Sequence, residues 1–115
     1  MRVLTGLLVL FTALSACSVA EEAKSDFDVF CGAFTALAAL SKYQEMNPLE
    51  RNTYLEAEAK KNTSLESNAF ITWVAVSSVE PSMRYPLFQE AAKASLKTDW
   101  DCTAMQRKSA HINAF

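Results

Sequence analysis

The stretch SDFDVFCGAFTALAALSKY, residues 25 to 43, decides the fold, because its apolar residues recur at intervals of three and four. Ser25 is a typical N-cap residue, and Asp28 stands three positions later, as in a capping box. One apolar stripe comprises Phe27, Phe30, Cys31, Phe34, Leu37 and Ala38. A second stripe beside it comprises Val29, Ala33, Ala36, Leu40 and Tyr43. A helix that is apolar around most of its circumference lies inside a fold, so we predict a central helix here.

The tetrapeptide Asn47-Pro48-Leu49-Glu50 predicts the end of this helix and the start of the next one. Asn47 can cap, Pro48 suits the first helical position, and Glu50 stands where a capping box needs a carboxylate. Glu, Ala and Lys dominate the following residues, so we expect a surface helix that runs to about Lys61. Its few apolar anchors are Leu49, Tyr54, Leu55 and Ala57.

The segment after residue 62 can be interpreted as a helix or as a strand. Thr63-Ser64-Leu65-Glu66 resembles a further N-cap, with Glu66 at the third helical position. Residues 70–78 are rich in β-branched and aromatic side chains, which favour a strand. No other segment offers a partner strand, and an isolated strand is unstable, so we favour a helix. Its apolar face would comprise Leu65, Ala69, Trp73 and Val76.

Two more helices are predicted in the last third of the chain. Glu80-Pro81 should end the preceding element, residues 81–85 should form a connection, and Pro86 suits the first position of a helix. Thr98 or Asp99 can cap a final helix. The residues at helical spacing in that final helix are Cys102, Met105, Ser109 and Ile112. The chain is therefore expected to be all-α, a small single-domain bundle of four or five helices.

The first residues carry a pattern typical of export. Arg2 precedes an apolar run, residues 3–14, which has the charge and length of a secretory leader and is too short to span a bilayer. Directly behind it, Leu14-Ser15-Ala16-Cys17 resembles the lipobox of bacterial lipoproteins. The resemblance implies cleavage before Cys17, lipidation of Cys17, and tethering of the mature protein to a membrane in the cell envelope.

This resemblance divides the chain into a signal peptide (1–16), a lipidated N-terminus and tether (17–25), and a helical domain (26–115). Ser18, because it is not acidic, implies sorting to the outer membrane. The alternative is an ordinary signal peptide cut after Ala20, since small residues stand at the positions that such cleavage recognises. That alternative gives a diffusible periplasmic protein, and both place the domain outside the cytosol.

The cysteines fit an oxidising compartment. If Cys17 is lipidated or removed, Cys31 and Cys102 remain, and a disulfide between them is the expected state outside the cytosol. It would join the central helix to the beginning of the last helix. A reactive or metal-binding thiol pair is a weaker interpretation, because there is no C-x-x-C spacing and no nearby histidine.

Composition and motifs favour a non-enzymatic role. The formal net charge of −2 does not suit a nucleic-acid-binding protein. His111, the single histidine, is four residues from the C-terminus, and no catalytic, metal-binding or phosphate-binding motif is present. The carboxylates stand in the context of charged helix surfaces or helix starts. We therefore expect no enzyme activity, no cofactor and no metal.

Aromatic residues near predicted element boundaries are the candidates for a binding surface. Arg84, Tyr85, Phe88 and Trp100 could form a partner-binding hot spot, since arginine, tyrosine and tryptophan predominate in such sites. We expect a non-catalytic protein that binds an envelope protein or a toxin, as immunity proteins and inhibitors do. The alternatives are a periplasmic stress chaperone, activated when low pH neutralises carboxylates, and a helical domain that binds a small ligand or a lipid.

Overall fold

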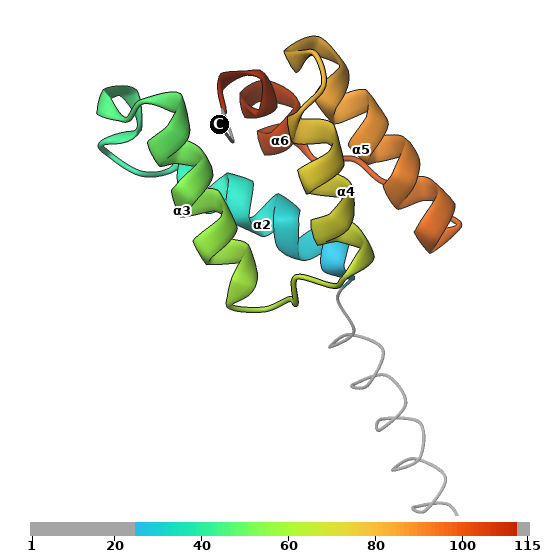
Figure 1. Cartoon of the computed structure of the whole chain (residues 1–115). Coiled ribbons are helices and arrows are strands. Elements are labelled where there is room, and N and C mark those ends of the chain that lie inside the picture. The colour runs from blue at the N-terminus through green and yellow to red at the C-terminus, as the bar shows by residue number, and fades with distance from the viewer. Residues whose placement is uncertain (1–24, 113–115) are drawn as a thin grey trace, which may run out of the picture.

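The computed structural model describes residues 25–112, which form five α-helices and two short 3₁₀ helices and contain no strand (Figure 1). The predicted all-α class is confirmed. In chain order the elements are α2 (Asp26–Ala38), η1 (Tyr43–Glu45), α3 (Pro48–Lys60), α4 (Asn68–Ser77), α5 (Pro81–Leu96), α6 (Thr103–Lys108) and η2 (Ser109–His111). The predicted signal peptide, Cys17 and the rest of the tether up to residue 24 lie outside the described residues.

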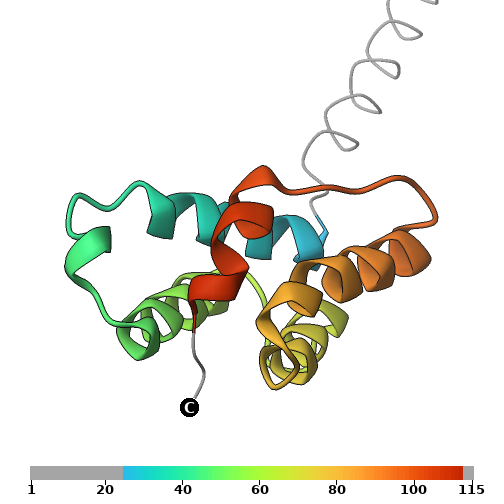
Figure 2. The same cartoon turned by 90° about the horizontal axis from the view of Figure 1, so that it is seen from above.

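Helix α2 is central, as predicted, and packs against α3, α4 and α6 (Figures 1 and 2). Its start follows from Ser25, whose hydroxyl accepts a hydrogen bond from the backbone N–H of Asp28 at 3.1 Å. The predicted second stripe continues too far, because the helix ends at Ala38 and Tyr43 begins η1 instead. The buried side chains of α2 are Phe27, Phe30, Ala33, Phe34 and Leu37.

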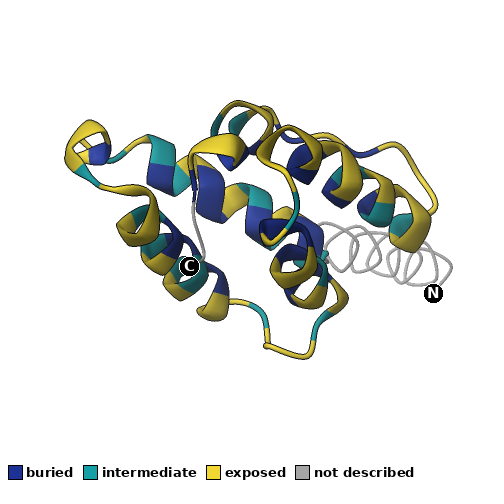
Figure 3. Ribbon diagram, turned by 45° about the horizontal axis from the view of Figure 1, so that its top comes forward, coloured by how far each residue is buried: buried dark blue, intermediate teal, exposed yellow. Residues whose placement is uncertain are grey.

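Aromatic rings from three helices fill the core around α2. Phe30 lies edge-on to Phe70 with ring centroids 5.2 Å apart, and Phe34 lies edge-on to Trp73 at 5.4 Å. The Trp73 ring is fully buried, and its Nε1–H donates to Oδ1 of Asn52 in α3 at 3.3 Å. Figure 3 shows the buried residues on the helix faces that turn toward one another. The described residues thus contain a hydrophobic core of their own.

The capping box at the start of α3 is present as predicted. The backbone N–H of Glu50 donates to the Asn47 side chain, and the backbone N–H of Asn47 donates to the Glu50 carboxylate, both at 2.8 Å. Of the four predicted anchors only Leu55 is fully buried, while Leu49 is 49% exposed and Ala57 is also exposed. The helix packs on α2 through a different face, formed by Asn52, Leu55 and Ala59.

Residues 68–77 form a helix, α4, so the strand interpretation of this segment is wrong. The predicted start at Thr63 is also wrong, because Ser67 is the N-cap and its hydroxyl accepts from the backbone N–H of Phe70 at 3.2 Å. Leu65, predicted on the apolar face, lies before the helix and is 55% exposed. Residues 69, 73 and 76 of the predicted face are buried.

The boundaries of the last two helices differ from the prediction. Pro81, and not Pro86, is the first residue of α5, so the predicted connection is helical and Pro86 lies inside the helix. Lys97 ends α5 with a left-handed backbone (φ 58°), and α6 begins at Thr103. The predicted caps at Thr98 and Asp99 are wrong, because the chain stays extended or bent there and buries the Trp100 ring.

The predicted disulfide joins Cys31 in α2 to Cys102, whose Cα atom lies 5.7 Å away. Helix α6 has only six residues, which is too short for a stable helix without tertiary contacts. The disulfide fixes Cys102, the residue directly before α6, to the central helix α2. All four residues that were predicted on one face of this segment are buried: Cys102, Met105, Ser109 and Ile112.

Candidate functional site

The four predicted hot-spot residues are buried in the fold, so the expectation that they are exposed is wrong. Their exposed fractions are 7% for Arg84, 8% for Tyr85, 0% for Phe88 and 7% for Trp100. Phe88 and Trp100 pack together with ring centroids 5.6 Å apart. The Tyr85 hydroxyl accepts the backbone N–H of Cys102 at 3.0 Å, and Arg84 Nη1 donates to the carbonyls of residues 109 and 112. These side chains hold the C-terminal segment of the same chain.

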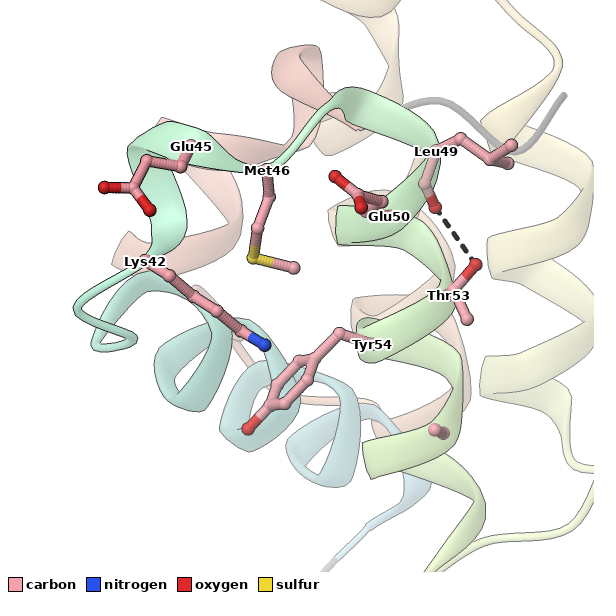
Figure 4. A pocket seen from close by; sticks show the side chains of 8 residues that line it. Lys42, Glu45, Met46, Leu49, Glu50, Thr53 and Tyr54 are labelled. Atoms are coloured by element: carbon pink, nitrogen blue, oxygen red, sulfur yellow. Dashed lines mark hydrogen bonds between the residues drawn. The ribbon is translucent and has the colours of Figure 1, made fainter.

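A surface groove of about 600 Å³ lies between the loop after α2 and the outer face of α3 (Figure 4). Lys42 and Tyr54 reach toward each other across it, and Met46 points toward them from the loop above (Figure 4). The Thr53 hydroxyl donates a hydrogen bond to the carbonyl of Leu49 at 3.1 Å. The α3 wall around Thr53 therefore presents mainly apolar surface to a ligand. The complete lining is Lys42, Glu45, Met46, Leu49, Glu50, Thr53, Tyr54 and Ala57.

Arg51 holds in place the wall of the groove that η1 forms, opposite α3. Its Nη2 and Nε donate to the carbonyl of Tyr43 at 3.0 and 3.3 Å, and its guanidinium lies 4.1 Å from the centre of the Tyr43 ring. Nζ of Lys108, from α6, lies 4.5 Å from the same ring centre. Cation–π contacts of this kind contribute about 0.5–2 kcal/mol each. The position of η1 is therefore fixed by α3 and α6 together.

The Tyr43 hydroxyl is buried without a hydrogen-bond partner among the described residues. Burial raises the pKa of this phenol, and the nearby Arg51 charge opposes the change with a smaller effect. The phenol therefore stays neutral at physiological pH. Its role in the fold is that of an aromatic surface for two cations.

The titratable side chains within residues 25–112 make mainly local contacts. Within residues 25–112 no three His, Cys, Asp or Glu side chains are placed to hold a metal ion. His111 is exposed, and its carbonyl accepts from Arg51 Nη1 at 3.3 Å. Several carboxylates have structural partners, such as Glu56 with Asn52 and Glu58 with Lys61. These contacts match the surface and capping roles that the sequence indicates.

The groove was not predicted, although one sequence signal points to it. Leu49 and Leu55 are six residues apart, which places them on different faces of a helix, so both cannot be core anchors. Leu49 and Ala57 share a face with Thr53, at intervals of four. The other wall, formed by Lys42 and Met46, comes from a turn whose position depends on tertiary contacts.

Comparisons with known proteins add no relative. No family model, no curated protein and no solved structure matches this chain. Among the helices formed by residues 25–112, none combines the length and the apolar character needed to cross a bilayer. The function must therefore be inferred from the residues themselves.

Proposed function

We propose that this chain is an exported, lipid-anchored helical protein that binds a segment of another envelope protein in the groove between η1 and α3. The observation that carries the proposal is the groove itself, whose lining combines apolar and charged side chains. The lipobox-like Leu14-Ser15-Ala16-Cys17 supports export and lipid anchoring in the cell envelope. In this proposal the chain binds its partner without catalysis, as immunity proteins and inhibitors do.

The groove lies far from the point where the tether enters the domain. The tether reaches α2 at Ser25, and the groove is formed after the other end of this 13-residue helix (Figures 1 and 2). A helix of that length extends about 20 Å. A partner could therefore approach the groove without competing with the membrane for the same face.

The lining indicates an apolar segment flanked by charges as the ligand. Leu49 is 49% exposed, and Met46 and Tyr54 are half-buried, so an apolar side chain laid between them would remove carbon surface from water. The single ion pair within residues 25–112 joins Lys61 to Glu58. Lys42 and Glu45 at the rim are thus available to charges of the opposite sign on a partner.

A stress chaperone is the second candidate, because large apolar side chains are also exposed on two other helices. Ile71 and Val74 in α4 are each 56% exposed, and Met83 and Leu87 in α5 are 44% and 41% exposed. Such side chains could contact unfolded clients. This candidate predicts that α4 and α5, and not the groove, carry the activity.

Site-specific photo-crosslinking in living cells of the native host tests the proposal. A photoreactive phenylalanine derivative is introduced at Thr53 in the groove and, as a control, at Ser95, an exposed residue near the end of α5. We expect a discrete crosslinked species from position 53 and none from position 95. Intact mass of the membrane-extracted protein tests the address, with diacylglycerol on Cys17 as the expected result.

Two matched substitutions then separate the candidates. Leu49→Asp places a charge in the groove, and Leu87→Asp places the same charge on α5, at residues of similar exposure. We expect Leu49→Asp to abolish the crosslink from position 53 and Leu87→Asp to leave it unchanged, with both variants keeping the wild-type melting temperature. A crosslink that survives Leu49→Asp contradicts the proposal. Loss of aggregation-suppressing activity in Leu87→Asp alone would favour the chaperone.

A further inference from the structure

A second cavity, of about 320 Å³, is lined by residues from the starts of α3 and α5 and from the C-terminal segment around η2, and it shares no lining residue with the groove. Its lining contains two arginines and the histidine and no acidic residue. Glu50 and Glu80 are the nearest carboxylates in sequence to these helix starts, and neither lines the cavity. The complete lining is Pro48, Arg51, Pro81, Arg84, Ala110, His111 and Ile112.

Two helices begin at this cavity. Pro48 is the first residue of α3, which has 13 residues, and Pro81 is the first residue of α5, which has 16. The N-terminal end of a helix carries a partial positive charge of about half an elementary charge. The Glu50 carboxylate already caps the start of α3, so the positive potential in this space comes from the start of α5 and from the two guanidinium groups.

Arg84 is the least compensated charge at this site. It is only 7% exposed, no Asp or Glu of residues 25–112 lies within ion-pair distance, and its Nε–H has no hydrogen-bond partner there. Only Nη1 is used, in bonds to the backbone carbonyls of Ser109 and Ile112. Burial lowers the pKa of this guanidinium, as expected for a cation removed from water without a counter-ion. A buried cation of this kind usually has an anionic partner.

We propose that this cavity is a binding site for a small oxyanion, a carboxylate or a phosphate group, held by Arg84 and Arg51 between the starts of α3 and α5. A guanidinium presents a planar fork of N–H donors that matches the oxygens of such groups. The anion would supply the counter-charge that Arg84 lacks among residues 25–112. It would also lie near the partial positive charge at the start of α5.

The side-chain spectrum of arginine gives a direct test. The chain has four arginines, at positions 2, 51, 84 and 107, so the protein without its leader shows three Nε–H signals by ¹H–¹⁵N NMR. Residues 18–115, which include the whole described core, are titrated with inorganic phosphate and with acetate, at constant ionic strength maintained with chloride. We expect saturable shifts of the Arg84 and Arg51 signals and no shift of the exposed Arg107 signal.

Variants distinguish binding from general ionic effects. Arg84→Lys keeps the positive charge but lacks the planar pair of N–H donors of a guanidinium. We expect it to bind the anion at least about tenfold more weakly, which corresponds to the loss of one charged hydrogen bond. Arg51→Lys serves the same purpose if the Arg84 variant does not fold. Absence of saturable shifts, or equal shifts of all three arginines, would overturn the proposal. Binding that occurs only after removal of residues 113–115 would show that the chain itself occupies the site. The proposal of an external ligand would then be wrong.

Discussion

Replacing both Cys31 and Cys102 by alanine should cost this fold a large part of its stability. The disulfide joins residues 71 positions apart and closes a loop that includes α3, α4 and α5. In the chain-entropy model, release of a loop of that length raises the entropy of the unfolded chain and destabilises the fold by about 4 kcal/mol. Domains of this size have total stabilities of about 5–15 kcal/mol. The double variant should therefore be marginally stable at 37 °C.

Urea unfolding of residues 18–115, followed by the fluorescence of the two tryptophans, measures this loss. Both rings are buried, so unfolding changes the environment of each. With a urea dependence of about 1–1.5 kcal/mol/M, the midpoint should fall by about 3 M. The wild type treated with a reductant serves as the control and should reach the same midpoint as the variant.

A loss below about 1 kcal/mol at an unchanged urea dependence would refute the entropic argument. It would mean that the unfolded chain is already restrained, or that the native protein carries two free thiols. Alkylation before and after reduction separates these explanations. If Cys31 and Cys102 react in the native protein, they are not bonded to each other, and α2 and the segment before α6 are held together by packing alone.

Three further predictions concern single residues. Asn47→Ala should remove the capping box of α3 and destabilise the fold by about 1 kcal/mol in urea unfolding, and no change would show that Pro48 alone sets this start. Pro86→Ala restores a backbone N–H inside α5 and should raise the melting temperature; a decrease would show that Pro86 acts through packing. Tyr43→Phe removes a buried hydroxyl that has no partner in residues 25–112, so stability at pH 7 should be unchanged or higher. Because burial raises the pKa of Tyr43 above its ordinary value of 10.0, the folded state keeps this proton longer than the unfolded chain, and wild-type stability should fall as the pH rises above 10.0. Unfolding curves at alkaline pH should show a weaker decline in Tyr43→Phe, and equal declines would contradict the shift.

The helix starts that sequence analysis located correctly are those encoded within four residues. Ser25 and Asn47 each accept the backbone N–H three positions later, and both partners are visible in the sequence. The pairing of Cys31 with Cys102 was equally accessible, because only two cysteines remain once Cys17 is assigned to the leader or the anchor. Local chemistry and simple counting sufficed for these features.

The boundaries that sequence analysis missed depend on tertiary packing. Pro81 and Pro86 are both acceptable at a first helical position, and the sequence alone does not rank them. The choice follows from Arg84 and Tyr85, which belong to the first turns of α5 and are buried against the C-terminal segment. The last helix starts late because Trp100 is buried and its Nε1–H donates to Asp28, 72 residues earlier.

The groove was missed for the same physical reason. Its α3 wall follows from helical spacing, but the opposite wall requires Tyr43 to lie beneath Arg51 and Lys108, which belong to two other elements. The Arg51 contacts are to a carbonyl and a ring, and neither leaves a recognisable motif. A site formed by such contacts becomes visible only after the helices have been placed.

The predicted hot spot shows how residue chemistry can be interpreted correctly and its partner misidentified. Arginine, tyrosine and tryptophan are enriched at the energetically important positions of protein interfaces because each combines a large apolar area with directional donors. The same properties stabilise contacts between two segments of one chain. Here Arg84 and Tyr85 bond the backbone of residues 102–112, while Trp100 reaches back to α2. Because α6 is too short to be stable alone, these bonds and the disulfide together make the C-terminal segment part of the fold. That segment in turn supplies one wall of the arginine-lined cavity, so the same docking that buried the predicted hot spot created the proposed anion site.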